Sequence, residues 1–267
     1  ILDETPAVAE VTGRPDIAFT GADAQHVTFS YGGETVLSDV SVTVPEHAIV
    51  GIVGRSGSGK STLLKLLMRF WVVQQGSVHI SDTDISAINT ANLRALEGFV
   101  TQDTHLFHDS IRSNLRIARP DATDAEIEAA CRKAAVHDFI CTLPQGYDTP
   151  VGELGDTLSG GERQRLFIVL ALIGQPELVF LDELTTGLDA KARRGVWKTL
   201  EALKDQGLTI FLTSHFMDEV EALCDEICIL KKGVPVFRGT VAQAKALCGC
   251  EHFEDAYLRL SDEEVDA

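Results

Sequence analysis

The sequence predicts an α/β fold, in which a mostly parallel sheet carries an antiparallel β edge and an inserted helical subdomain. Short apolar strands alternate with helices along most of the chain, as expected for a parallel sheet covered by helices on both faces. A glycine-rich loop lies between an apolar strand and a helix near residue 54. The stretch from about Asp109 to Leu158 is mainly helical and interrupts the alternation, so it indicates a subdomain of its own.

The elements follow from the spacing of apolar residues. Alternating apolar positions predict short strands at about His26–Tyr31 and Val40–Val44, and the apolar strand Ala48–Val53 precedes the glycine loop. The leucine spacing after this loop predicts a helix over Lys60–Phe70. Farther along, the sequence predicts a strand at Phe99–Thr101, a helix opened by a capping box at Thr123–Glu126, a helix at Gly161–Ile173, a strand at Leu178–Leu181, a helix at Lys191–Lys204 and a strand at Leu208–Thr213.

Three regions are expected along the chain. Residues 1–22 carry proline, glycine and acidic residues with weak periodicity, and we interpret them as a linker. Residues 23–240 form the main domain, with the helical subdomain inserted at about residues 103–160. Residues 241–267 are expected to form a C-terminal helical tail.

Composition and charge argue against several classes of protein. Hydrophobic residues make up 45% of the 267 residues and charged residues 24%, which is ordinary for a globular domain. No run of about 18 uninterrupted apolar residues exists, so no segment is expected to span a bilayer. The formal net charge of -17 argues against a nucleic-acid-binding surface, which needs clustered basic residues. The six cysteines lack the paired spacing of a zinc site, and we expect them to be reduced thiols.

The glycine loop fits the phosphate-loop pattern G-x-x-x-x-G-K-[ST] at every fixed position. Its backbone N–H groups and the following helix N-terminus can surround anionic oxygens, Lys60 would reach the β- and γ-phosphates, and Ser61 would bind Mg²⁺. A chance Gly/Ser loop is the alternative, and the strand before it and the helix after it argue against that. The nucleotide-binding residues expected in this P-loop NTPase core are Gly54, Ser56, Gly57, Ser58, Gly59, Lys60, Ser61 and Thr62.

Two carboxylates, Asp182 and Glu183, directly follow the apolar strand Leu178–Leu181. Ligands gather at the carboxyl edge of a parallel sheet, so both side chains are expected at such an edge. Asp182 would hold Mg²⁺ through water, and Glu183 would act as the general base that polarises the attacking water. A solvated strand end is the alternative, and the upstream phosphate loop favours the functional interpretation.

The segment Leu158–Gln164, LSGGERQ, is the most specific motif of the chain. With the phosphate loop and the acidic strand end, it makes the chain resemble the ATP-binding-cassette ATPases from about Tyr31 to Lys232. In that family this segment acts on the ATP held by a neighbouring subunit. The resemblance therefore implies that two such domains bind two ATP molecules between them, head to tail.

Further roles are implied by the resemblance, residue by residue. Ser159, Gly160 and Gly161 would contact the γ-phosphate held by the opposing subunit. Gln102 would contact Mg²⁺ and water and sense the transport partner, and His215 would contact the γ-phosphate as the switch histidine. Tyr31 would stack on adenine, with a solvent-facing tyrosine as the alternative, and Asp189 would lie in the loop that crosses the dimer interface. That loop usually begins with proline in the family, where this chain has Leu184.

Two branches of the family are represented in the sequence. Ile1–Glu4, Leu106–Leu115, Leu143–Asp148 and Val151–Gly155 resemble exporters whose ATPase domain follows membrane helices in the same chain. His215–Asp225 and Phe253–Leu258 resemble separately encoded ATPases of drug and lipid export. We weight the exporter fusion higher, because the segments that would face the membrane domain carry it.

The sequence thus predicts an ATPase that powers export from the cytoplasmic face of a plasma or inner membrane, with ATP and Mg²⁺ as ligands. Its expected partners are a second nucleotide-binding domain and a six-helix transmembrane domain, encoded upstream, that contacts the Gln102 and Val151–Gly155 regions. Alternatives are a separately encoded exporter subunit, a soluble family member of translation or DNA repair, and an idle regulatory module. The transported substrate and the choice between homodimer and heterodimer stay open.

Overall fold

Buried apolar strands form the centre of both units into which the chain divides. The computed structural model describes residues 8–152 and 158–261. The first unit comprises residues 1–94 and 209–267, and the second comprises residues 95–208. The predicted segments Ile1–Glu4 and Glu153–Gly155 lie outside the described residues.

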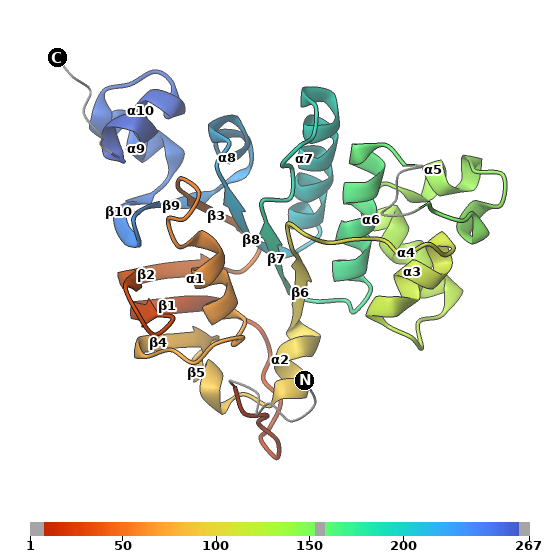
Figure 1. Cartoon of the computed structure of the whole chain (residues 1–267), viewed down its shortest axis with the longest axis horizontal. Helices are drawn as coiled ribbons and strands as arrows, with labels where there is room; N and C mark the ends of the chain where they lie inside the picture. Colours follow the sequence, from red (N-terminus) through yellow and green to blue (C-terminus); the bar gives the residue numbers. More distant parts are fainter. Residues whose placement is uncertain (1–7, 153–157, 262–267) are drawn as a thin grey trace. The chain divides into compact units, whose positions relative to one another are not determined.

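The first unit contains most of the strands (Figure 1). Its elements are β1 (Gly21–Ser30), β2 (Thr35–Pro45), β3 (Ile49–Val53), α1 (Lys60–Leu67), β4 (Gln75–Ile80), β5 (Thr83–Asp84), a 3-10 turn at Ile85–Ala87, α2 (Thr90–Leu96, in which the division falls), β8 (Thr209–Ser214), α8 (Met217–Leu223), β9 (Glu226–Lys231), β10 (Val234–Gly239), α9 (Val241–Cys248) and α10 (Phe253–Leu260). The strands β2, β1, β4 and β5 form an antiparallel sheet in that order, while β3 pairs in parallel with β8 and β9.

The second unit combines two parallel strands with the predicted helical subdomain. Its elements are β6 (Glu97–Val100), α3 (Ile111–Ala118), α4 (Asp124–Lys133), α5 (His137–Thr142), a 3-10 turn at Gly146–Asp148, α6 (Gly160–Leu172), β7 (Leu178–Asp182) and α7 (Ala190–Asp205). Figure 1 shows α3, α4 and α5 gathered on one side of α6. The predicted capping box opens α4: Glu126 N donates to Thr123 Oγ1 at 3.3 Å and Thr123 N donates to Glu126 Oε2 at 2.8 Å.

The antiparallel strand β1 is longer than the predicted strand at His26–Tyr31. A bulge interrupts its pairing between Ala24 and Val27, where His26 has a φ of 51°. The bulge breaks the alternation of side chains, so the sequence pattern reveals only the second half of the strand. β1 begins at Gly21, and Phe19 is buried, so the last part of the predicted linker packs on the first unit.

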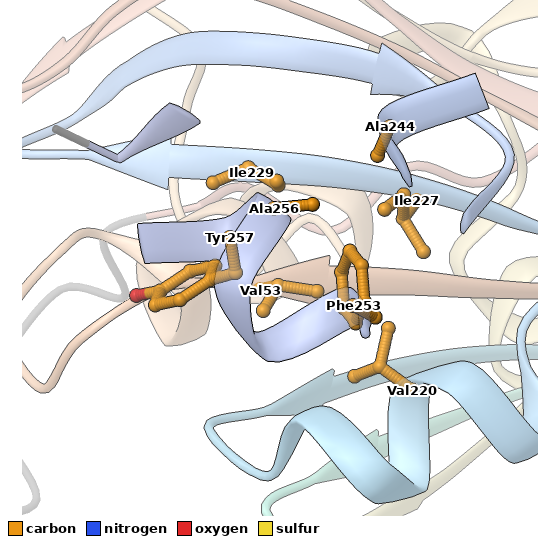
Figure 2. Packing of buried hydrophobic residues seen from close by; sticks show 8 residues of the cluster. All are labelled: Val53, Val220, Ile227, Ile229, Ala244, Phe253, Ala256 and Tyr257. Atoms are coloured by element: carbon orange, nitrogen blue, oxygen red, sulfur yellow. The ribbon is translucent and has the colours of Figure 1, made fainter. Parts of the chain in front are cut away.

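The C-terminal region folds as the helices α9 and α10, which pack on the end of β9 and β3 (Figure 1). Figure 2 shows the buried cluster that joins them, in which Phe253 and Tyr257 of α10 meet apolar side chains of β3, β9 and α8. None of the helices formed by residues 8–152 and 158–261 combines the length and apolar character that crossing a bilayer requires. All six cysteines lie among the described residues as free thiols.

Candidate functional site

The phosphate loop of the first unit depends on glycine at two positions. It follows β3, all five residues of which are buried, and ends at the start of α1. A Cβ at Gly54 would come within 2.5 Å of the carbonyl oxygen of Leu230. Gly59 has a φ of +99°, and a Cβ there would lie 2.6 Å from a methyl group of Leu37. Only glycine fits these two positions without strain, so the tight turn of the loop is built into the sequence.

The side chain of Lys60 lies within the loop that it ends. It is 4% exposed, and Nζ donates hydrogen bonds to the carbonyl oxygens of Gly54 at 2.8 Å and Arg55 at 3.1 Å. Ser58 is 5% exposed, and its Oγ has no hydrogen-bond partner among the described residues. A buried hydroxyl without a partner is costly unless a ligand or water satisfies it. The loop backbone, the ammonium of Lys60 and the hydroxyl of Ser58 are therefore suited to bind an anionic ligand.

Tyr31 belongs to a small aromatic group beside the start of α1. Its ring packs edge to face on Phe29 and on Trp71, with centroid separations of 5.0 and 5.2 Å. Its hydroxyl lies 3.1 Å from Thr62 Oγ1, which ties the end of β1 to the helix that follows the phosphate loop. The residue is 50% exposed, so ring surface remains open to a stacking partner. The sequence analysis did not single out Trp71, although the aromatic pair Phe70–Trp71 at the end of the predicted helix was a visible signal.

His215 lies at the same edge of the sheet as the phosphate loop. β3 and β8 are parallel neighbours in which Val53 pairs with Ser214, so Gly54 and His215 both follow paired positions. Ser214 Oγ donates to the buried carboxylate of Glu219 at 2.6 Å, which fixes the turn that carries His215. The imidazole is exposed.

In the second unit, Gln102 and Glu183 follow two paired parallel strands, as Gly54 and His215 do in the first unit. β6 and β7 are parallel, and Val100 pairs with Leu181, so each of the two predicted residues lies two positions beyond a paired residue. Asp182 ends the fully buried strand β7 and is 8% exposed. The structure thus gathers an amide and two carboxylates at one edge of this strand pair. The sequence predicted this edge for the two carboxylates from the strand end, and the position of Gln102 came from the family resemblance.

The backbone at Glu183 has a φ of 50°, in the left-handed region that residues other than glycine seldom adopt. A turn starts here, since Thr186 N donates to the carbonyl oxygen of Glu183 at 3.1 Å. Non-glycine residues held in such conformations cluster at functional sites. Glu183 is partly exposed, so its carboxylate can reach a ligand at the strand end.

Ser159 is the N-cap of α6, within the LSGGERQ segment. Its Oγ accepts a hydrogen bond from Glu162 N at 3.4 Å, and Glu162 Oε2 accepts one from Ser159 N at 2.8 Å. These two bonds form a capping box, which fixes the first turn of the helix. The hydroxyl acts here as an acceptor, so its own proton is left to donate, and the residue is exposed.

The first turn of α6 packs closely on the turn before α7. A Cβ on Gly160 would lie 2.8 Å from a methyl group of Leu188, and one on Gly161 would lie 3.3 Å from the Cβ of Ala192. Asp189 caps α7, accepting hydrogen bonds from Lys191 N at 2.9 Å and Ala192 N at 2.8 Å. The two glycines of LSGGERQ thus leave little room for a side chain beside the start of α7, a packing feature that the sequence pattern did not indicate.

The predicted site residues fall into two groups, one in each unit. The first unit holds Tyr31, the loop from Gly54 to Thr62 and His215, and the second holds Gln102, Ser159–Gly161, Asp182, Glu183 and Asp189. In the first unit, the loop has a buried unpartnered hydroxyl and a buried ammonium, which fit the phosphates of ATP, and Ser61 carries an oxygen donor of the kind that Mg²⁺ prefers. In the second unit, Gln102 and Asp182 carry such oxygen donors as well.

Fold and site together define a P-loop nucleotide-binding protein with an α/β core. The model of the family "ABC transporter" matches residues 37–186, from β2 through the phosphate loop to the turn after β7. The chain belongs to the ABC transporter family, and its residues are those of the ATPase domain of this family.

The chain is similar to transporters from bacteria and animals. It is 43% identical over 234 residues to a probable ABC transporter ATP-binding/permease protein of Haemophilus influenzae, covering 87% of this chain and 42% of that protein. It is 39% identical over 242 residues to ATP-binding cassette sub-family B member 6 of Mus musculus, covering 90% and 28%.

Among solved structures, a bacterial Atm1-family ABC exporter with ATP bound matches 99% of this chain and 46% of its own length, with a TM-score of 0.85 at 34% identity. This match confirms the predicted fold class. The chain spans less than half the length of each of these relatives.

Proposed function

We propose that this chain binds ATP with Mg²⁺ and hydrolyses it as the nucleotide-binding domain of an ABC exporter, working in head-to-tail pairs. The observation that carries the proposal is the phosphate loop, because it combines a buried lysine ammonium, an unpartnered buried hydroxyl and glycines at the two tightest positions. Such a loop, followed by a helix N-terminus, is built to bind phosphate.

The first unit binds and orients the nucleotide. Backbone N–H groups of the loop and Nζ of Lys60 would hold the β- and γ-phosphates, and the exposed ring of Tyr31 would stack on adenine. His215 would contact the γ-phosphate from the end of β8. Because Lys60 is already fixed by two carbonyl oxygens, little reordering of its side chain is needed when phosphate binds.

The second unit supplies the groups for hydrolysis. Glu183 would accept a proton from the attacking water, as a general base. Asp182, Gln102 and Ser61 are the residues that would hold Mg²⁺, directly or through water, and the ion when bound would neutralise charge on the phosphate oxygens. The parallel register of β6 and β7 supports joint action of Gln102 and Glu183, since both follow paired positions.

The start of α6 would complete the ATP site of a partner subunit. Ser159 would donate its hydroxyl proton and Gly160 and Gly161 their N–H groups to the γ-phosphate held by the partner, with Asp189 beside the interface. Two observations support this: Ser159 is exposed, and its capping bonds leave the hydroxyl proton to donate.

The relatives support a proposal for the rest of the transporter. Their printed names describe an ATP-binding/permease protein and an exporter, and the chain covers less than half of each. This supports a fused membrane domain upstream, with residues 1–22 as the linker, residues 23–240 as the ATPase domain and residues 241–267 as the helical tail. The membrane domain would contact the Gln102 and Val151–Gly155 regions and place the chain at the cytoplasmic face of a membrane.

Glu183→Gln tests the proposal. The amide cannot accept the proton of water, so steady ATP turnover should fall by about 10²–10⁴-fold while ATP binding persists and the closed dimer accumulates. Turnover, nucleotide affinity and sedimentation in the presence of ATP would be measured together. Near-normal hydrolysis in this variant would remove Glu183 as the base, and absence of ATP binding in the unchanged chain would overturn the proposal as a whole.

A further inference from the structure

The C-terminal helix α10 packs on the end of β3, directly before the phosphate loop. Its inner face is formed by Phe253, Ala256 and Tyr257, each at most 8% exposed. These side chains pack in one buried cluster with Val53 of β3 and Ile229 of β9 (Figure 2). Val53 is the last residue of β3, and the phosphate loop begins at the next residue. The helix is therefore packed on the point from which the loop departs.

Strand β9 and the turn after it approach the loop at two places. Leu230 of β9 follows Ile229, and its carbonyl oxygen is the atom that a Cβ on Gly54 would approach to 2.5 Å. Gly233 N donates to the carbonyl oxygen of Ser58 at 3.0 Å. Contacts made by α10 on Ile229 are thus one residue away from the point where the backbone of β9 closely approaches Gly54.

A cavity of about 210 Å³ lies where α10 meets the loop. It is lined by Arg55–Ser58 of the loop, by Leu230 and Lys231 of β9 with Lys232 of the turn that follows, and by Tyr257 and Ser261. Tyr257 is the residue of α10 that belongs to both the buried cluster and the wall of this cavity. Loss of its ring would enlarge the cavity and remove the packing that supports the loop on this side.

We propose that α10 positions the phosphate loop for ATP binding, with Tyr257 as the positioning residue. The inference rests on the proposed function of the loop. The loop must hold its N–H groups in a fixed arrangement to bind phosphate, and the ring of Tyr257 keeps the end of β3 and the β9–β10 turn in that arrangement. The loop contacts the phosphates both before and during hydrolysis, so loss of this support weakens binding of ground and transition state alike and raises KM more than it lowers kcat.

Tyr257→Ala in the 267-residue chain tests the inference. If the binding-competent fraction of the loop falls to about a tenth, the Kd and KM for ATP rise about tenfold, with kcat changed by less than about twofold. Tyr257→Phe retains the ring and should bind ATP as the unchanged chain does. Tyr257→Leu, which keeps an apolar contact without the ring, should fall between them and replaces Tyr257→Ala if that variant does not fold.

Phe253→Leu provides the matched control. Phe253 is fully buried in the same helix and cluster but does not line the cavity beside the loop. The Phe253→Leu variant should have a lower Tm than the unchanged chain and the same Kd for ATP. If Tyr257→Ala lowers Tm in the same way and leaves Kd unchanged, α10 has only a structural role and the inference is wrong. A failure of the unchanged chain to bind ATP would instead overturn the proposed function, so the two failures are distinguishable.

Discussion

Ser159 has a structural role and a proposed functional role, and substitutions can separate them. Its hydroxyl oxygen caps α6, while its hydroxyl proton is proposed to reach the phosphate of the partner subunit. Aspartate is also a good N-cap, because its carboxylate accepts the same N–H hydrogen bond. Ser159→Asp should therefore preserve the helix and place a negative charge where a phosphate is expected. Ser159→Ala should remove the cap without adding charge.

The two substitutions differ in expected magnitude. The Ser159 Oγ bond is long, at 3.4 Å, and Glu162 keeps its own 2.8 Å bond to Ser159 N, so Ser159→Ala should cost about 0.5–1 kcal/mol of stability, at the low end for a lost cap. That corresponds to a fall in Tm of about 1–4 °C for a domain of this size. Two like charges about 4 Å apart repel by about 4 kcal/mol near a protein surface. Ser159→Asp should thus lower ATP turnover by about 10³-fold with little change in Tm.

Mixed pairs reveal on which subunit Ser159 acts. Subunits that carry Ser159→Asp should be inactive alone, because both sites of such a pair lack Ser159. Subunits that carry Lys60→Ala should be inactive alone, because both sites of such a pair lack Lys60. In a mixed pair, the intact loop of the first variant meets the intact Ser159 of the second. ATPase activity should therefore reappear when the two are combined. If mixing restores nothing, or if Ser159→Asp hydrolyses ATP normally, the head-to-tail reasoning is wrong.

Two further substitutions test the loop and the helical subdomain. Lys60→Ala removes the ammonium that bridges the carbonyl oxygens of Gly54 and Arg55, so the Kd for ATP should rise at least tenfold (about 1.4 kcal/mol), whereas Lys65→Ala on the same helix should leave it unchanged in nucleotide titrations. Burial raises the pKa of the Cys131 thiol from 9.0 to about 11. Between these two values the folded state keeps a proton that the unfolded chain loses. The contribution of this thiol to the free energy of unfolding, which is fully present below pH 9, should therefore fall by roughly 2–3 kcal/mol as the pH rises to 11. Burial also raises the pKa of the Cys228 thiol, to about 12, so part of the loss should persist in Cys131→Ala. Urea unfolding at pH 8 and pH 11 should therefore show a larger loss in the unchanged chain than in Cys131→Ala, by about this amount; an equal loss in both would contradict the assignment.

Much of the fold could be predicted because apolar runs and caps are local signals. The strand before the phosphate loop, the capping box at Thr123 and the strand before Asp182 all lie where the sequence places them. The strand β4 was missed because Gln75–Ile80 is largely polar and sits in an antiparallel sheet with only part of it buried. β10 was missed because Pro235 interrupts its pattern, which a strand at the edge of its sheet tolerates.

Candidate site residues could be proposed from the sequence where a motif or a strand end assigns one chemical use to a residue type. Lys60, Ser61 and Asp182 follow from motif and strand end alone, and Ser159 follows from the resemblance. The contacts between distant segments could not be predicted, since no local pattern specifies them. Two examples are the close approach of Gly160 to Leu188 and the packing of α10 on the end of β3. Both depend on tertiary structure, which brings together residues that are far apart in the sequence.

The left-handed backbone at Glu183 means that the best residue for folding and the best residue for the proposed chemistry differ at this position. Glycine would adopt a φ of 50° without the steric cost of about 1 kcal/mol that a residue with a Cβ incurs. Glu183→Gly should therefore relieve strain in the turn while abolishing hydrolysis. The chain has a strained residue at the position where the proposed chemistry needs a carboxylate. A screen of substitutions at Glu183 for thermal stability alone should therefore enrich variants that do not hydrolyse ATP.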